Sequence, residues 1–90
     1  VQLHLEFLAD AQGLGGRIQV KVSGTKSPDL EASSTCGILT PEKSPHPGIF
    51  AWRFAPDSPS CTRSLVTVVE RQHAVATAIS IPSLKGSQAP

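Results

Sequence analysis

The sequence is poor in aromatic side chains and lacks methionine, tyrosine and asparagine. Its 90 residues include one Trp and three Phe, while hydrophobic residues make up 39%. The core must therefore consist mainly of Val, Leu, Ile and Ala, and so small a core often needs a staple, a metal or a partner. The absence of Asn excludes N-glycosylation within this stretch. The absence of Met, also at position 1, is typical of a processed chain or an excised domain.

Charge is balanced and scattered along the chain. Eight basic and seven acidic residues give a net charge of +1. A nucleic-acid partner would require basic residues gathered on one face, and no such cluster is indicated. No apolar run is long enough to span a bilayer and no signal peptide is recognisable, so we expect no membrane insertion.

The residues that usually bind metals or perform catalysis also lack a recognisable arrangement. The histidines, His4, His46 and His73, have no zinc-ligand spacing to the cysteines, so we expect no metal and no cofactor. The acidic residues show no spacing that pairs two carboxylates, which predicts a solvated surface for Glu6, Asp10, Asp29, Glu31, Glu42, Asp57 and Glu70. The glycines of 13–16 indicate a turn, because no helix follows them to complete a phosphate-binding loop.

Two cysteines in so short a chain favour a single disulfide, Cys36 to Cys61. A loop of that size would stabilise the fold by roughly 3 to 4 kcal/mol in the chain-entropy model. A disulfide in turn favours an oxidising compartment. The alternative is two reduced, buried thiols, since Cys is often simply a core residue.

Alternation of apolar and polar residues predicts strands. Val1–Phe7 and Arg17–Val22 alternate cleanly, and a hairpin joins them most simply. Thr62–Arg71 and Ala74–Ile81 are rich in β-branched residues, and their hairpin would turn at Gln72-His73 although the usual Gly or Asn is absent. Apolar residues on both faces place Thr62–Arg71 centrally in its sheet.

A fifth strand, Ile49–Phe54, holds most of the aromatic side chains. Phe50, Trp52 and Phe54 share one face, which indicates core packing or, alternatively, a partly exposed platform for a partner. The candidate partner-binding residues are accordingly Trp52, Arg53, His46 and Phe50.

The remaining segments are expected to be loops or short elements. Ser23–Thr35 is polar and predicts a long loop, or one helical turn at 29–32. Cys36–Leu39 is a candidate short strand. Prolines predict a stiff surface loop over Thr40–Gly48 and a turn over Ala55–Ser60.

Together these patterns predict an all-β fold, a small antiparallel β-sandwich or barrel of about six strands with proline-rich loops. Residues 1–82 would form one domain, and 83–90 a C-terminal tail or linker. The order Cys…Trp…Cys occurs in immunoglobulin domains, but these cysteines are too close together and no tyrosine is available for a tyrosine corner. The chain therefore does not fit that pattern closely.

The predicted function is non-enzymatic: an extracellular or secretory-lumen β-module that binds a protein partner or spaces neighbouring domains. Its contacts would come from the loops at 10–16, 40–48 and 55–60. An exposed edge strand such as Val1–Leu8 could also form a homodimer.

Two alternatives remain open at this point. One is an intracellular interaction domain with reduced cysteines and phosphorylation at its Ser-Pro and Thr-Pro sites, at positions 27, 40, 44 and 58. The other is a small hydrolase with His73 as its base, although no nucleophile-elbow sequence is present.

Overall fold

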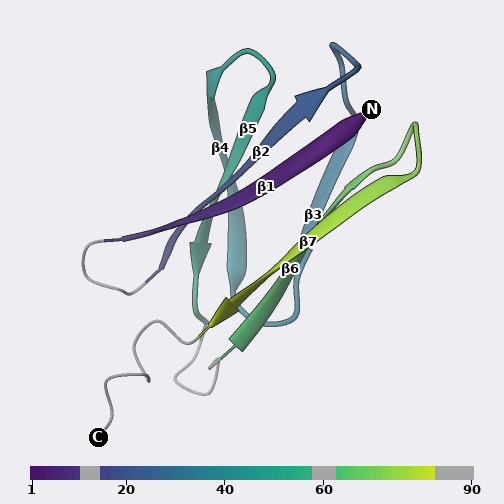
Figure 1. Ribbon diagram of the computed structural model, residues 1–90. Helices are drawn as coiled ribbons and strands as arrows, with labels where there is room; N and C mark the ends of the chain where they lie inside the picture. The colour runs from purple at the N-terminus through teal and green to yellow at the C-terminus, as the bar shows by residue number, and fades with distance from the viewer. Residues whose placement is uncertain (11–14, 58–62, 83–90) are drawn as a thin grey trace, which may run out of the picture.

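The structure, a computed structural model, describes residues 1–10, 15–57 and 63–82. Within these residues the chain forms seven antiparallel strands and no helix (Figure 1). The strands are β1 (Gln2–Ala9), β2 (Gly16–Ser23), β3 (Leu30–Ser34), β4 (Ile38–His46), β5 (Ile49–Ala55), β6 (Arg63–Glu70) and β7 (Val75–Pro82). The prediction of an all-β fold is therefore confirmed. No helix in this part of the chain is long and apolar enough to cross a bilayer.

The strands form two sheets packed face to face. We call the four-stranded sheet, with the order β1-β2-β5-β4, sheet A, and the three-stranded sheet, with the order β3-β6-β7, sheet B. This is the strand order of a constant-type immunoglobulin sandwich. The tryptophan and cysteine of immunoglobulin domains occupy other strands than they do here: Trp52 is on β5, and Cys36 is in the turn between β3 and β4. The chain therefore has this strand order without the tryptophan and cysteine positions of immunoglobulin domains.

The two predicted hairpins are both present. β1 and β2 pair along their whole length, with Leu5 opposite Val20 and Phe7 opposite Ile18. β6 and β7 pair from Arg63–Pro82 to Glu70–Val75, and β6 is the central strand of sheet B as expected. Their turn lacks Gly and Asn, and Ala74 supplies the positive φ of 55° instead. That conformation is uncommon for a residue with a side chain.

Two loop predictions are wrong. Leu30–Ser34, within the expected polar loop 23–35, is a strand because it pairs with β6 from Leu30–Glu70 to Ser34–Val66. Ile38–His46 is a strand across most of the expected loop 40–48, and it pairs with β5. Its prolines are compatible with a strand because β4 is at the edge of sheet A, where backbone N–H groups can face solvent, and its register shifts between Glu42 and His46.

The core is a layer of mostly branched aliphatic side chains between the sheets. β2 and β6 each bury every second residue, as a two-residue period requires. The buried apolar side chains are Ile18, Val20, Val22, Phe54, Val66, Val68 and Ile81 between the sheets, with Ala51 also buried. One aromatic pair extends this layer, since the Phe7 ring meets the Phe54 ring edge to face at a centroid distance of 6.3 Å.

The segment 83–90, expected to be a tail or linker, lies outside the described residues. The same holds for residues 11–14 and 58–62. Of the loop at 10–16, Asp10 and Gly15 are described, and the Asp10 N–H donates to the Gly15 carbonyl oxygen at 2.8 Å.

The core predicts a matched pair of truncations. Ile18→Ala, at a side chain that is 0% exposed, should lower the free energy of unfolding by about 2–5 kcal/mol, because it leaves a cavity between the sheets. Ile38→Ala makes the same change at a side chain that is 56% exposed and should cost about 0.5 kcal/mol or less. Urea unfolding of both variants checks this; equal losses would contradict the assigned core.

Candidate functional site

The four side chains predicted to bind a partner do not lie on one surface. Phe50 and Trp52 are half-buried and pack against the core between the sheets. Arg53 lies on the opposite side of β5, where its guanidinium is 2.5 Å from the Asp10 carboxylate. His46 is exposed at the end of β4. Two of the expected contact loops, 10–16 and 55–60, are described only in part, and the third is largely β4.

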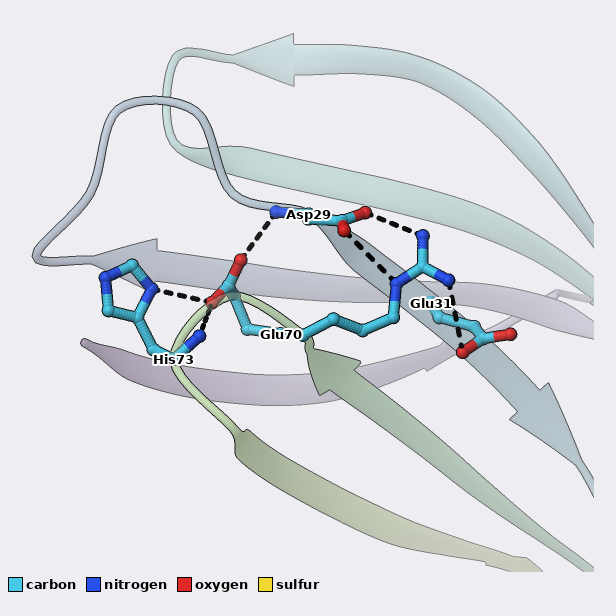
Figure 2. A network of polar contacts seen from close by, with 5 residues as sticks. Asp29, Glu31, Glu70 and His73 are labelled. Carbon is cyan, nitrogen blue, oxygen red and sulfur yellow. Dashed lines mark hydrogen bonds and ion pairs between the residues drawn. The ribbon is translucent and has the colours of Figure 1, made fainter.

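The most connected polar group of the described chain is the carboxylate of Glu70 (Figure 2). Its side chain is 0% exposed, at the end of β6 where the hairpin turn begins. One oxygen accepts the N–H of Asp29 at 2.6 Å. The other accepts the N–H of His73 at 2.8 Å and the His73 ring Nδ1–H at 2.7 Å. The carboxylate thereby joins the loop before β3 to the β6–β7 turn.

Arg71 adds a second connection between the same two segments. Its guanidinium donates two hydrogen bonds to Asp29, at 3.2 and 2.8 Å, and lies 3.8 Å from Glu31. Its backbone N–H donates to the Asp29 carbonyl oxygen at 2.9 Å. The hydrogen bonds and charge of Asp29, with the charge of Glu31, raise the pKa of Arg71 above its usual value.

The expectation that Glu70 is solvated is therefore wrong. The hydrogen bond from the Asp29 N–H has the largest effect on the Glu70 carboxyl and lowers its pKa. Burial raises the pKa, and the contacts with His73 lower it again, so that the pKa of Glu70 falls from 4.5 to about 2. The strand pattern explains the burial. Glu70 falls on the same side of β6 as Val66 and Val68, so only a fully hydrogen-bonded carboxylate is compatible with its position.

The Glu70–His73 pair has part of the geometry of a catalytic triad. A buried carboxylate orients an imidazole through Nδ1, and the ring is partly exposed. Within the described residues, no Ser or Thr hydroxyl hydrogen-bonds to that ring. His73 therefore has an orienting acid but no nucleophile there. The described residues also contain no group of three His, Cys, Asp or Glu side chains that could hold a metal ion.

The opposite end of the sandwich is organised around the turn at 35–37. The Ser64 hydroxyl, which is buried, donates to the Cys36 carbonyl oxygen at 2.6 Å. The Leu65 N–H donates to the Thr35 hydroxyl at 2.9 Å, and the Thr35 N–H to the Leu65 carbonyl oxygen at 3.1 Å. Gly37 adopts a φ of +95° beneath the Phe54 ring, where a Cβ would lie 2.5 Å from Cε1. The turn is thus fixed against the beginning of β6.

Cys36 lies in this turn, and its Sγ is 3.3 Å from the carbonyl oxygen of Arg63. The cysteine expected to pair with it, Cys61, is outside the described residues. The disulfide therefore stays a prediction, with one of its two positions located.

The outer surfaces of the two sheets differ in charge. Sheet A carries ionised side chains across its outer face, including Glu6, Arg17, Lys21, Arg53 and Glu42, and Arg17 pairs with Glu42 at 3.0 Å. The outer face of sheet B has uncharged residues at its centre, where Thr67 lies between Ser33 and Ala78, and towards one end Val69 lies between Glu31 and Ala76.

We call this second surface the neutral face. Its members are uncharged side chains that are exposed or half-buried on β3, β6 and β7: Ser33, Leu65, Thr67, Val69, Ala76, Ala78 and Ser80. Glu31 and Arg63 are at its margins. Leu65 is 45% exposed, so the neutral face presents apolar area to solvent.

Comparison with known proteins gives the chain no relative: no family model, curated protein or solved structure matches it. The immunoglobulin-type strand order is thus a likeness of topology alone.

The buried carboxylate predicts a pH-dependent stability. Because the pKa of Glu70 is about 2 in the folded protein and has its ordinary value of 4.5 in the unfolded chain, its contribution is fully present above about pH 5 and is lost as the pH falls to 2. Glu70→Gln should melt several degrees lower than the wild type at pH 7, and the two melting curves should converge by pH 2.

Glu31→Gln is the matched control, because it removes a carboxylate that is 63% exposed and makes only a long contact with Arg71. Its melting temperature should remain close to that of the wild type at every pH. Thermal unfolding followed by circular dichroism between pH 2 and 7 measures all three proteins. A Glu70→Gln curve parallel to the wild type through this range would contradict the assignment.

Proposed function

We propose that this domain is a non-enzymatic β-module that binds a protein partner or spaces neighbouring domains, in the extracellular space or the lumen of the secretory pathway. The observation that carries the proposal is the difference between the two outer faces. A solvated sheet surface normally carries charge, as sheet A does, whereas the neutral face presents Leu65, Val69 and small residues. Interface centres are depleted of charged residues in the same way.

The partner in this proposal is another protein. That protein can also be a second copy of this chain, bound through an edge strand. The neutral face forms the centre of the contact, and Glu31 and Arg63 at its margins provide a polar rim. Trp52 and Phe50 support this surface from within, since both pack against the core on which β6 also rests. In this proposal the contact lies on the outer face of sheet B.

The proposed compartment depends on the disulfide between Cys36 and Cys61. Arg63, whose carbonyl oxygen is next to the Cys36 sulfur, is two residues after Cys61. That the two cysteines are joined is a prediction from the sequence, since Cys61 lies outside the described residues. A covalent link there would join the β3–β4 turn to the segment before β6, and such links persist in oxidising compartments.

The alternative with phosphorylated Ser/Thr-Pro sites has less support. Thr40 and Ser44 lie within β4 and not in a loop. The Ser44 hydroxyl donates to the backbone carbonyl oxygens of His46 and Ile49, so its modification would disturb the β4–β5 end.

The redox state of the cysteines has a direct test. Alkylation and mass spectrometry of protein taken from its native compartment should find no free thiol, and reduction should lower the free energy of unfolding by roughly 3 to 4 kcal/mol. A double variant, Cys36→Ser with Cys61→Ser, should match the reduced protein. Two free thiols in the native material would contradict the extracellular proposal.

The neutral face has a matched pair of variants, because Leu65 and Leu8 are both 45% exposed and lie on the outer faces of different sheets. Leu65→Lys should reduce cross-linking of the tagged domain to other proteins on intact cells by about tenfold, the effect of losing one central apolar contact. Leu8→Lys should leave it unchanged. Quantitative mass spectrometry of the cross-linked products measures both, and equal cross-linking by the two variants would overturn the proposed surface.

A further inference from the structure

The four strands at the sheet edges are protected to very different degrees. β4 carries Pro41, Pro45 and a register shift, and β3 has only five residues and includes Glu31. β1 places His4 and Glu6 on its outer side. Prolines, irregularities, charges and short length are the usual features that prevent an edge from pairing with another chain. β7 has eight residues, no charge, and a proline only at its last position.

The free side of β7 is unpaired within the described residues. Its backbone pairs with β6 alone, and no other described segment exchanges a backbone hydrogen bond with it. β1 lies beside β7 on this side of the sandwich but belongs to the other sheet (Figure 1). Leu5 and Phe7 of β1 share a core cluster with Ile79, so β1 covers inward side chains without bonding to the edge.

The sequence of β7 is complementary to a second, antiparallel copy of β7 centred on Ala78, because side chains of similar size then face each other. In an antiparallel pair with its two-fold axis at that residue, Val75 faces Ile81 and Thr77 faces Ile79, all on the inner side. On the outer side Ala76 faces Ser80, and Ala78 faces its own copy. Branched side chains thus meet branched ones and small ones meet small ones, with no like charges opposed, as an isologous contact requires.

We propose that β7 pairs antiparallel with β7 of a second copy of this chain, with the two-fold axis at Ala78. The pairing joins the two three-stranded sheets into one continuous six-stranded sheet and satisfies the free backbone groups of both edges. The neutral faces of the two copies become one surface, because Ala76, Ala78 and Ser80 belong to that face. This inference rests on the proposed function as a protein-binding module, and it adds a second copy of the chain, bound through β7, as a partner.

The register gives a test in which only the sign of charge differs. Position 76 of one copy faces position 80 of the other, twice in each dimer. The double variant Ala76→Lys with Ser80→Lys places like charges opposite each other at both places, whereas Ala76→Lys with Ser80→Glu places opposite charges there. Both residues are exposed on the outer side of β7, and they are four residues apart within one chain, so neither variant creates a close charge pair inside the monomer.

Sedimentation velocity from micromolar to millimolar concentration measures the dimer dissociation constant. The wild-type protein should dimerise, and the Lys/Lys variant should have a dissociation constant about tenfold or more above that of the Lys/Glu variant. Thr67→Lys, on the same face but on the central strand β6, should leave the dimer intact. Circular dichroism and thermal melting establish that each variant is folded.

Three results would overturn the inference. A wild-type protein that stays monomeric throughout the range has no β7 pairing. Equal dissociation constants for the two double variants would place the contact elsewhere. Loss of the dimer in Thr67→Lys with retention in the Lys/Lys variant would mean that the neutral faces stack on each other. If the protein is monomeric but Leu65→Lys still reduces cross-linking to other proteins by about tenfold, the proposed function stands and the β7 pairing is rejected.

Discussion

Burial of branched aliphatic side chains between two sheets is the constraint on which this structure depends. With so few aromatic residues, the chain has little apolar area per side chain, so it must bring several strands together to remove enough of that area from water. Ile18 on β2 and Val66 on β6 are fully buried in one layer, although 48 positions separate them in the sequence. The hairpins are local, but their stability comes from this contact between the sheets.

Hydrogen bonds from polar side chains fix the turns at the two ends of the sandwich, beyond the apolar core. At one end the Glu70 carboxylate accepts the backbone N–H groups of Asp29 and His73, and it holds the loop before β3 against the β6–β7 hairpin. At the other end Ser64 and Thr35 fix the turn that contains Cys36. Each of these contacts joins the β6–β7 hairpin to a segment outside it, so both ends of the sandwich are fixed as well as the core.

The sequence predicted the strands that alternate or that are rich in β-branched and aromatic residues. β1, β2, β5 and the β6–β7 hairpin were predicted within a residue or two of their ends, because both patterns are local properties of the strand itself. β3 was missed, and β4 was anticipated only at Ile38 and Leu39, within the candidate strand Cys36–Leu39, since the patterns of both strands are weak. β3 is polar and is a strand because of its partner β6, while the prolines of β4 are tolerated only at an edge, and neither condition can be recognised locally.

The Glu70 contacts and the neutral face were also predictable from the sequence only in part. The sequence indicated a turn at Gln72-His73 but gave Glu70 a solvated position. Counting by twos from Val66 and Val68 places Glu70 on the inner side, so a signal for its burial was present. The partners that make the burial tolerable, the Asp29 N–H and the His73 ring, come from the three-dimensional arrangement and have no sequence pattern. The neutral face likewise requires the strand order, because it combines residues of β3, β6 and β7.

The direction of the first and last strands has a mechanical consequence. β1 begins at the end of the sandwich where the β6–β7 turn lies, and β7 finishes at the end where the β3–β4 turn lies (Figure 1). Tension applied through Gln2 and Pro82 therefore runs along the strands and across their hydrogen bonds. The β1–β2 and β6–β7 ladders are then loaded in shear, so that many bonds share the force at once and the domain resists extension better than a hairpin opened from one end.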